Sequence, residues 1–498
     1  MNQKIATPRD ASAVILLNET GNRVLWARRN PQLAFLGGWH AFPGGKLEKS
    51  DADCAVKNCA DAELAPFIVC AVREAFEEVG VLLVRNGEKL TRGQRASLHD
   101  DLISGRMTFA EILAHWNLWI DARDFYYTGF WTTPNFSPIR FKTRFFLVVC
   151  PSKQTPFAAI SEMENVEFIK PDDALKKWER SEVLISPPVL LSLKTLGEIP
   201  DSRFQIPDSV ADRLLENSQT VDGVVRYVEF NPRTICFPLK TETLPPATHT
   251  NCFVVGRKKF VVIDAASKDE SEQKALHELI DSFIERGFNC RAIITTHHHS
   301  DHFGGETALQ KHLFDKFGLQ IPLAAHRATA ENLTGKVEFQ KFIETGETFD
   351  LENETGAKFQ LETIHTPGHA SGLLAFYDAE FGFLLTSDNV INSSSVVIAP
   401  PNGNLRNYLH TLERLRDLPN LRFLCGSHGS AVFDAKAKIE DYIAHRLERE
   451  KQILHAIKNG AKTVREIVAA VYIELKPELV RLAEKSVEAH LEKINEEI

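Results

Sequence analysis

The stretch Thr295-Thr296-His297-His298-His299-Ser300-Asp301-His302 is unusually rich in potential metal ligands. It directly follows Ala292-Ile293-Ile294, an apolar run typical of a buried strand. Because side chains alternate along a strand, His297 and His299 can converge on one point if the chain turns there, while Asp301 and His302 face a second point. Imidazole and carboxylate groups bind Zn²⁺ and similar metals. The stretch therefore predicts a site for two metal ions at the end of a strand.

Later segments of the chain place the same kinds of side chain directly after apolar runs. They are Thr366-Pro367-Gly368-His369, Thr386-Ser387-Asp388 and Gly426-Ser427-His428-Gly429. A single histidine in such a place is more often a core or surface residue than a ligand, so the prediction depends on the recurrence of the pattern. We expect His298 to point away from the site and His365 to lie behind the ligands, and His326 has no assigned role.

These motifs resemble the metallo-β-lactamase superfamily, which is defined by H-x-H-x-D-H and by later histidine, aspartate and histidine positions. The resemblance implies an αββα sandwich holding two Zn²⁺ ions, with Mn²⁺ or iron as alternatives. One ion would be held by His297, His299 and His369, the other by Asp301, His302 and His428, and Asp388 would bridge both. Asp301 and Asp388 would also be catalytic residues, and a hydroxide that bridges the metals would be the nucleophile, because metal binding lowers the pKa of water to near neutrality. Cys425-Gly426-Ser427 departs from the commoner proline-glycine form before His428, which is retained.

A second group of chemically active residues lies upstream, in Arg73-Glu74-Ala75-Phe76-Glu77-Glu78-Val79-Gly80-Val81. In a helix, Glu74, Glu77 and Glu78 share one face, where like charges repel. A bare cluster of this kind is usually a solvated acidic face. Here Gly80 is suited to end the helix, and the upstream turn Pro43-Gly44-Gly45 lets backbone approach a ligand. Together these features favour a Mg²⁺ site, because Mg²⁺ takes oxygen ligands and substrate phosphates.

This stretch resembles the Nudix box, and the match runs from Arg73 to Val81, with Gly45 as the opening glycine. Asp51 stands where the family has glutamate, and the 21 residues between Asp51 and Arg73 make a longer gap than the family pattern. Such an insertion resembles the branch that includes the coenzyme A diphosphatases. The resemblance implies an α/β/α sandwich that hydrolyses a diphosphate small molecule. Its site residues would be Glu77 and Glu78 on Mg²⁺ or Mn²⁺, Glu74 as a further ligand or base, Arg73 as the residue that orients the glutamates, and Gly44 and Gly45 in the binding turn.

The length of 498 residues allows about three domains. Turn-rich segments and a change in composition predict an α/β multidomain chain. Its parts are a Nudix-like domain at 9–198, a linker at 199–222, a metallo-β-lactamase-fold domain at 223–432 and a helical tail at 433–498. The tail pattern predicts a helix at 435–458 followed by shorter helices. The tail resembles the winged-helix part of the lactamase-beta-like protein 2 group, which includes an endoribonuclease.

Composition excludes several classes of protein. The chain is 43% apolar and 25% charged with a net charge of −9, unlike a strongly basic nucleic-acid binder. No apolar run approaches the ~20 residues of a membrane-spanning helix, and the first residues do not resemble an export signal. We therefore expect a cytoplasmic protein without a membrane partner, whose eight cysteines are reduced thiols. The sequence is compatible with an oligomer.

Three functions remain open on these motifs. The first is cleavage of phosphodiesters in single-stranded RNA, coupled to Nudix hydrolysis of a nucleoside-diphosphate-type linkage. The RNA part rests on resemblance, because the tail carries about as many acidic as basic residues. The second is a thioester hydrolase of the glyoxalase II type coupled to a coenzyme A diphosphatase-like domain. In the third, the Nudix-like domain is a ligand sensor without catalytic activity.

Overall fold

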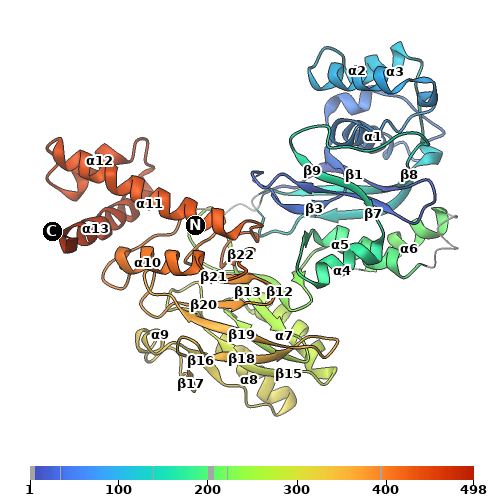
Figure 1. Cartoon of the computed structure of the whole chain (residues 1–498). Coiled ribbons are helices and arrows are strands. Elements are labelled where there is room, and N and C mark those ends of the chain that lie inside the picture. Colours follow the sequence, from blue (N-terminus) through green and yellow to red (C-terminus); the bar gives the residue numbers. More distant parts are fainter. Residues whose placement is uncertain are drawn as a thin grey trace. The chain divides into compact units, whose positions relative to one another are not determined.

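The computed structural model describes residues 6–33, 35–137, 139–199, 207–220, 223–392 and 395–497. The chain divides into two compact units, unit 1 (Met1–Val228) and unit 2 (Glu229–Ile498). Figure 1 shows the elements of both units. Within the described residues, no helix combines the length and the apolar character needed to cross a membrane.

Unit 1 is built on a mixed sheet of the order β10-β3-β2-β1-β8-β7, with β4 paired to β1 and β9 paired to β2. The first two strands form an antiparallel hairpin, in which Leu17 pairs with Val24. The elements of unit 1 are β1 (Arg9–Leu17), β2 (Val24–Arg29), β3 (Trp39–Ala41), β4 (Gly44–Lys46), β5 (Val56–Lys57), α1 (Ala65–Val79), α2 (Arg92–Ile103), α3 (Phe109–His115), β6 (Ile120–Asp121), β7 (Tyr126–Thr132), β8 (Phe141–Val149), β9 (Met163–Ile169), α4 (Pro171–Glu179), β10 (Leu184–Ile185), α5 (Pro187–Gly197) and α6 (Pro207–Thr220).

Both faces of this sheet are covered by helices. Along β1, Val14 and Leu16 pack into the core formed with α1, α2 and α3, whereas Ile15 and Leu17 pack into the core formed with α4, α5 and α6. This alternation is the period of two expected of a strand that is buried on both sides. Figure 1 shows the two helix layers above and below the sheet. The predicted α/β/α sandwich is therefore confirmed.

The segment predicted as a linker at 199–222 differs from that expectation where it is described. Helix α6 occupies most of it, and Val210, Ala211 and Leu214 are buried in the core of unit 1. Only a few apolar residues form the buried face of this helix. The segment is therefore polar in overall composition, which is why the sequence indicated a linker. Residues 200–206 and 221–222 of the segment lie outside the described residues.

Unit 2 contains a curled sheet of the order β11-β12-β13-β14-β18-β19-β20-β21-β22, from which β15, β16 and β17 continue beside β14. Its elements are β11 (Val228–Asn231), β12 (Thr234–Lys240), β13 (His249–Gly256), β14 (Lys259–Ile263), α7 (Glu270–Glu285), β15 (Asn289–Ile294), α8 (Glu306–Phe317), β16 (Leu323–Ala325), α9 (Arg327–Asn332), β17 (Lys341–Phe342), β18 (Thr348–Glu352), β19 (Lys358–His365), β20 (Leu374–Asp378), β21 (Phe383–Ser387), α10 (Leu405–Arg416), β22 (Phe423–Gly426), α11 (Ala435–Lys458), α12 (Val464–Val471) and α13 (Val480–Glu497).

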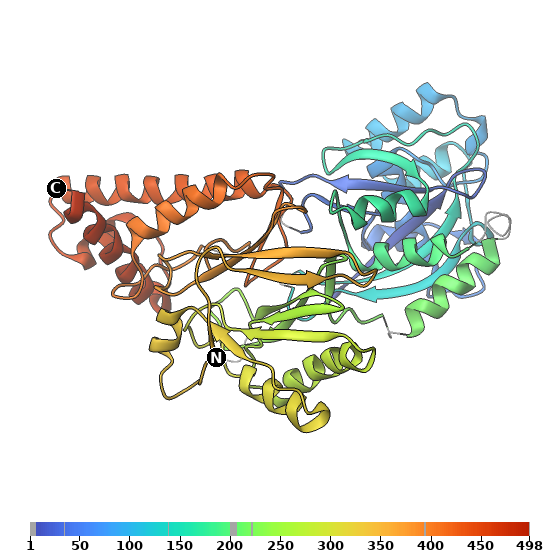
Figure 2. The ribbon, with the colours of Figure 1, turned by 60° about the horizontal axis from the view of Figure 1, so that its bottom comes forward.

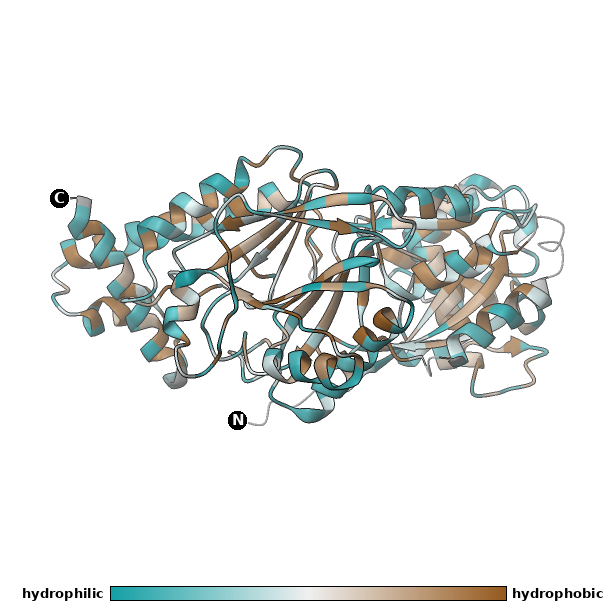
Figure 3. Cartoon of the chain, turned by 90° about the horizontal axis from the view of Figure 1, so that it is seen from below, coloured by the Kyte–Doolittle hydropathy of each residue, from teal (hydrophilic) through white to brown (hydrophobic). Residues whose placement is uncertain are grey.

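Two helix layers enclose the strands of unit 2. Helices α7 and α8 pack on β12, β13 and β14 around Ile280 and Leu313, while α10 and α11 pack on β19 to β22 around Leu412 and Ile439. Figure 2 shows the strands between these layers, and Figure 3 shows apolar strands next to helices that alternate between polar and apolar surface. This arrangement confirms the predicted αββα sandwich.

The tail begins with α11, which matches the helix predicted at 435–458. The first half of this helix belongs to the sandwich, because Ile439 and Tyr442 lie in the same core as α10. Its second half packs with α12 and α13 around Ile453 and Val487. The helix therefore continues without a break from the sandwich into the tail.

Candidate metal centres

The predicted ligands of unit 2 lie in the loops that follow four of its strands. The stretch His297–His302 follows β15, His369 follows β19, Asp388 follows β21 and His428 follows β22. Strands β14 and β15 are parallel, as are β21 and β22, so the loops after them emerge at matching edges of the sheet. The fold thereby brings together side chains that are far apart in the sequence.

Three of the histidines converge first. The His299 Nδ1 atom lies 3.0 Å from His297 Nε2 and 2.8 Å from His369 Nε2. All three nitrogens lie within 4.8 Å of one another, a separation at which a single ion could touch each of them. Burial lowers the pKa of His299 and of His369 to about 4, so both rings are neutral near pH 7 and keep a lone pair for a metal.

A second group is formed by Asp301, His302 and His428, whose ligand atoms also lie within 4.8 Å of one another. His428 Nε2 is 3.5 Å from Asp301 Oδ2, and His302 Nε2 is 3.9 Å from Asp301 Oδ1. The group therefore offers two imidazoles and one carboxylate from two segments of the chain, the loops after β15 and β22. This donor set suits Zn²⁺, Mn²⁺ and iron.

Asp388 lies between the two groups. One of its oxygens, Oδ2, is 3.5 Å from His302 Nε2 and 3.6 Å from His369 Nε2. Its other oxygen, Oδ1, is 3.7 Å from His428 Nε2. Although burial opposes ionisation, His302 and His428 hold the pKa of Asp388 well below its usual range. The carboxylate is therefore charged and placed to bridge two ions.

Unsatisfied polar atoms show that these residues fit metal ions. His302 Nε2 and Asp388 Oδ1 are buried and have no hydrogen-bond partner among the described residues. Burying such atoms without a partner is unfavourable. Bound ions would satisfy both atoms and neutralise the charge of Asp388. The donor chemistry and the unsatisfied atoms therefore agree.

The ring orientations of the histidines are set by residues that the sequence analysis missed. His302 Nδ1 donates to Asp264 Oδ2 at 2.8 Å, and His369 Nδ1 donates to the carbonyl of Val397 at 2.8 Å. His428 Nδ1 donates to the carbonyl of His249 at 2.9 Å. Each bond holds the hydrogen on Nδ1 and leaves Nε2 to face the site, which is how ligand histidines are usually supported. The only signal for Asp264 in the sequence is its place directly after an apolar strand.

We expect Asp264→Asn to lower the affinity of unit 2 for Zn²⁺ by about tenfold to a hundredfold. The Asp264 carboxylate also accepts hydrogen bonds from the Thr296 amide and hydroxyl, so the variant removes a charge that supports the whole loop. Asparagine keeps the shape and tolerates the left-handed backbone at this position, where φ is 55°. Competition with a coloured chelator measures the affinity. The exposed Asp350→Asn variant is the matched control, and equal affinity in both variants would contradict the assigned role.

Three further histidines near the site, His298, His326 and His365, belong to neither candidate group. His298 Nε2 is 3.4 Å from the side-chain amide of Asn402. His326 and His365 stack with ring centroids 3.9 Å apart, and His365 Nε2 donates to the carbonyl of Ser371.

Helix α11 holds the loop that supports His369. Arg446 donates to the Val396 carbonyl and, at 3.3 Å, to the Ser395 hydroxyl. The hydroxyl of Tyr442 donates to the Ile391 carbonyl at 2.8 Å and accepts from its amide at 3.2 Å. The Val397 carbonyl that orients His369 is thus next to a residue held by α11.

In unit 1, the gap between Asp51 and Arg73 closes in the folded chain. Asp51 lies in a short helix, η1 (Lys49–Asp53), and is buried. The Arg73 guanidinium donates to both of its carboxylate oxygens, at 2.8 and 3.0 Å. Another nitrogen of Arg73 donates to Glu74 at 2.8 Å and to Glu77 at 3.2 Å. Arg73 therefore orients three carboxylates, although 21 residues separate Asp51 from Arg73 in the sequence.

The predicted glycine turn contacts the glutamates on α1. Gly44 N donates to Glu78 Oε2 at 2.8 Å. A Cβ atom at Gly45 would lie 2.5 Å from the Glu74 carboxylate, so a larger residue here would displace that side chain. Gly80 has a φ of 68° and ends α1, as predicted. The turn and the helix thus form one site.

The carboxylates of this site crowd one another. Burial raises the pKa of Glu74 to about 7 and that of Glu78 well above its usual range. Burial is the largest cause of the raised pKa of Glu78, followed by repulsion from the Glu74 carboxylate. The Glu162 carboxylate, in the loop before β9, raises this pKa further. The sequence analysis missed Glu162. A divalent cation would relieve this repulsion, so the residues present fit Mg²⁺ or Mn²⁺.

Comparison with known proteins places a family in each unit. The model of the metallo-beta-lactamase superfamily matches residues 245–428, the NUDT19 Nudix domain matches residues 55–196, and the beta-lactamase associated winged helix domain matches residues 463–497. Both enzyme families use divalent metals.

Curated relatives match each half separately. The nudix hydrolase 7 of Caenorhabditis elegans is 27% identical over 203 residues, which are 39% of this chain and 62% of that protein. The Beta-lactamase-like protein 2 homolog of Caenorhabditis elegans is 26% identical over 264 residues, 53% of this chain and 80% of that protein. An atrochrysone carboxyl ACP thioesterase of Pseudocercospora fijiensis is 25% identical over 230 residues, 45% of this chain and 62% of that protein. The chain is therefore a fusion of two hydrolase-family domains, a Nudix domain and a metallo-β-lactamase domain, the second followed by an associated winged-helix domain.

Proposed function

We propose that the chain is a hydrolase with two independent metal-dependent sites, one in each unit. The observation that carries this proposal is the position of Asp388, whose two oxygens lie 3.5 to 3.7 Å from histidines of both candidate groups in unit 2. The first ion would be held by His297, His299 and His369. Asp301, His302 and His428 would hold the second, with Asp388 shared.

The chemistry proposed for unit 2 is the hydrolysis of a phosphodiester. Bound metals supply water activation near neutral pH and neutralise the charge that develops on the substrate. The chain contributes the orientation: Asp264 and the carbonyls of Val397 and His249 hold the histidine rings, and α11 holds the loop beside His369. Zn²⁺ is the ion we propose, with Mn²⁺ or iron as alternatives.

Single-stranded RNA is the phosphodiester substrate that we propose to test first. Support comes from the resemblance of the tail to the lactamase-beta-like protein 2 group. The winged-helix match at 463–497 and the Beta-lactamase-like protein 2 homolog agree with that resemblance. A cytoplasmic location is part of this proposal, because all eight cysteines are free thiols.

Thioester hydrolysis is the second candidate for unit 2. A specific observation favours it, namely that one relative of this unit is named as an acyl-carrier-protein thioesterase. The Nudix unit adds a second argument, because its insertion resembles that of the coenzyme A diphosphatases. Both units would then act on substrates that carry the same thiol cofactor.

In unit 1 we propose hydrolysis of a nucleoside-diphosphate-type linkage. Glu77 and Glu78 would hold Mg²⁺ or Mn²⁺, Glu74 would serve as a further ligand or base, and Arg73 would keep the carboxylates in place. The alternative is a sensor that binds the same ligand without turnover. Measured hydrolysis that is lost in Glu77→Gln refutes the sensor, whereas ligand binding without any turnover in the wild type supports it.

Two assays run in parallel separate the substrate classes for unit 2. Labelled single-stranded RNA and S-lactoylglutathione are each incubated with the full chain and Zn²⁺ or Mn²⁺. Asp388→Ala serves as the inactive control. Cleavage of RNA alone, lost in the variant, supports the phosphodiester proposal. Hydrolysis of the thioester alone, likewise lost, contradicts it and favours the second candidate.

A further inference from the structure

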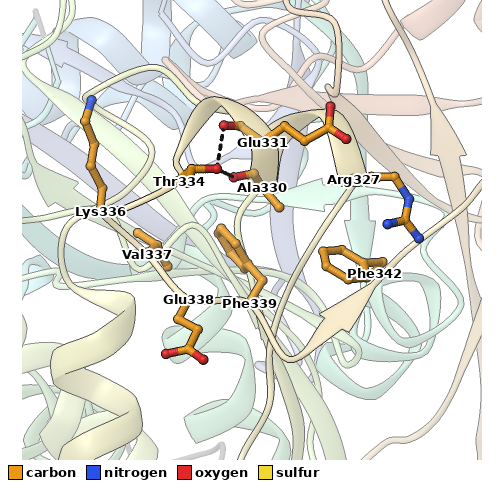
Figure 4. A pocket seen from close by; sticks show the side chains of 10 residues that line it. Arg327, Ala330, Glu331, Thr334, Lys336, Val337, Glu338, Phe339 and Phe342 are labelled. Carbon is orange, nitrogen blue, oxygen red and sulfur yellow. Dashed lines mark hydrogen bonds between the residues drawn. The ribbon is translucent and has the colours of Figure 1, made fainter.

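A cavity of about 580 Å³ lies in unit 2 between helix α9 and the chain leading to β17. We call it the α9 pocket, and its wall includes Arg327, Glu331, Lys336, Glu338, Phe339 and Phe342. Figure 4 shows the two phenylalanine rings at its centre, with Lys336 and Arg327 at opposite sides. A volume in this range is typical of pockets that bind small molecules, roughly 300–1,000 Å³.

The aromatic wall of the pocket is open to a ligand. Phe342 is 41% exposed, and the Arg327 guanidinium lies 4.6 Å from the centroid of its ring. The Phe339 ring is only partly buried. An exposed ring held beside a cation is a suitable surface for stacking a flat aromatic group, because every base presents a π-face.

The two cations of the pocket are available to bind an anion. Among the residues that the structure describes, neither Arg327 nor Lys336 forms an ion pair, although Glu331 and Glu338 share the same wall. The two glutamates balance the two cations, so the pocket has no excess positive charge to attract a bare polyanion. A ligand with both a ring and phosphate groups satisfies the ring and the cations together.

The last residue of α9 and Lys336 of the pocket wall are linked to sequence neighbours of the candidate ligands. Asn332, the last residue of α9, accepts from the Asn402 amide at 3.4 Å, and that same amide lies 3.4 Å from His298 Nε2. Lys336 Nζ lies 5.7 Å from the centroid of Phe303, the residue after His302. These contacts join the pocket wall to sequence neighbours of the candidate ligands, and we infer that a substrate bound at the metals extends into the α9 pocket.

We propose that the α9 pocket binds a nucleotide unit of the substrate, with its base against Phe342 and Phe339 and its phosphates at Arg327 and Lys336. This inference rests on the proposed hydrolytic role of the metal centre. Two substrates contain such a unit: an RNA strand, and a coenzyme A thioester, which ends in a phosphorylated adenosine. The shared chemistry is a base with phosphate on its ribose.

Inhibition by a nucleotide tests the pocket. Adenosine 3′,5′-bisphosphate and inorganic phosphate are compared as inhibitors of bis(p-nitrophenyl) phosphate hydrolysis by the full chain with Zn²⁺. We expect Phe342→Ala and Lys336→Ala to raise the ratio of the nucleotide to the phosphate inhibition constant by about tenfold. Lys341→Ala is the matched control, because Lys341 contacts Glu347 and the Phe349 ring instead of the pocket. An unchanged ratio in both pocket variants, or an equal change in the control, overturns the proposal.

Two further measurements separate the outcomes. A Michaelis constant that rises in Lys336→Ala for an oligoribonucleotide identifies RNA as the source of the nucleotide unit, and a rise for an acyl-coenzyme A identifies the thioester. No rise for either overturns the proposal. If the wild type hydrolyses none of these substrates, the proposed function is wrong. The α9 pocket is then tested by calorimetry, which measures the binding of adenosine 3′,5′-bisphosphate to the wild type and to the three variants. Binding at the Nudix domain contributes equally to all four proteins, so a tenfold loss confined to the pocket variants supports the site and equal binding overturns it.

Discussion

Replacing Asp388 with alanine is expected to reduce hydrolysis by unit 2 by about a thousandfold or more. The reason is that this carboxylate lies between the two candidate groups, within 3.7 Å of His302, His369 and His428. Without it, the two ions lose a common ligand and the buried histidines lose a compensating charge. The effect should therefore fall on the turnover number and on metal content together.

The measurement is kcat/KM of the full chain on the better of the two substrates for unit 2, with saturating Zn²⁺. Asp350→Ala is the matched control, because Asp350 is an exposed carboxylate on β18 outside the candidate groups. Thermal unfolding of both variants checks that the fold persists. Activity in Asp388→Ala within about tenfold of the wild type would contradict the two-metal assignment.

Glu78→Gln is expected to lower diphosphate hydrolysis by unit 1 by at least about a hundredfold. Glu78 is buried and accepts from Gly44 N, so glutamine can keep the contact geometry on one side while removing the charge that would bind the cation. Because the two units have separate sites, hydrolysis by unit 2 should be unaffected by this change.

Both activities are measured on the same preparation of protein with Mg²⁺ and Zn²⁺ present. Glu88→Gln removes an exposed carboxylate of unit 1 and serves as the control. A parallel loss of both activities in Glu78→Gln would argue against independent sites. Unchanged diphosphate hydrolysis would show that Glu78 does not hold the catalytic cation.

Patterns with a short period allowed much of the fold to be predicted from the sequence. The apolar run Ala292-Ile293-Ile294 predicted a buried strand, and these residues form the buried end of β15. The composition of 435–458 predicted α11. The ligand positions could be predicted because His369, Asp388 and His428 each follow a strand. The loops after these strands bring the three side chains together. Strands, helices and the residues that follow them can be predicted from sequence patterns, because they depend on residues that are neighbours in the chain.

Features that depend on distant contacts were not predicted. Asp264 supports His302 because β14 and β15 are parallel and pair Ile263 with Ile294, a register that no local pattern reveals. Helix α6 was assigned to a linker because only Val210, Ala211 and Leu214 carry its buried face. The α9 pocket likewise depends on how a short helix and a loop fold back beside the metal centre.

The central claim is that unit 2 binds two metal ions through Asp388, and metal content tests it most directly. The full chain is dialysed in a buffer with a fixed low concentration of free Zn²⁺, in the Glu78→Gln background so that the metal site of unit 1 contributes little. Zinc per chain is then determined by mass spectrometry with and without the further change Asp388→Asn. We predict two ions per chain in the first protein and one or fewer in the second. Equal zinc content in both proteins, or no bound zinc in either, would contradict the account.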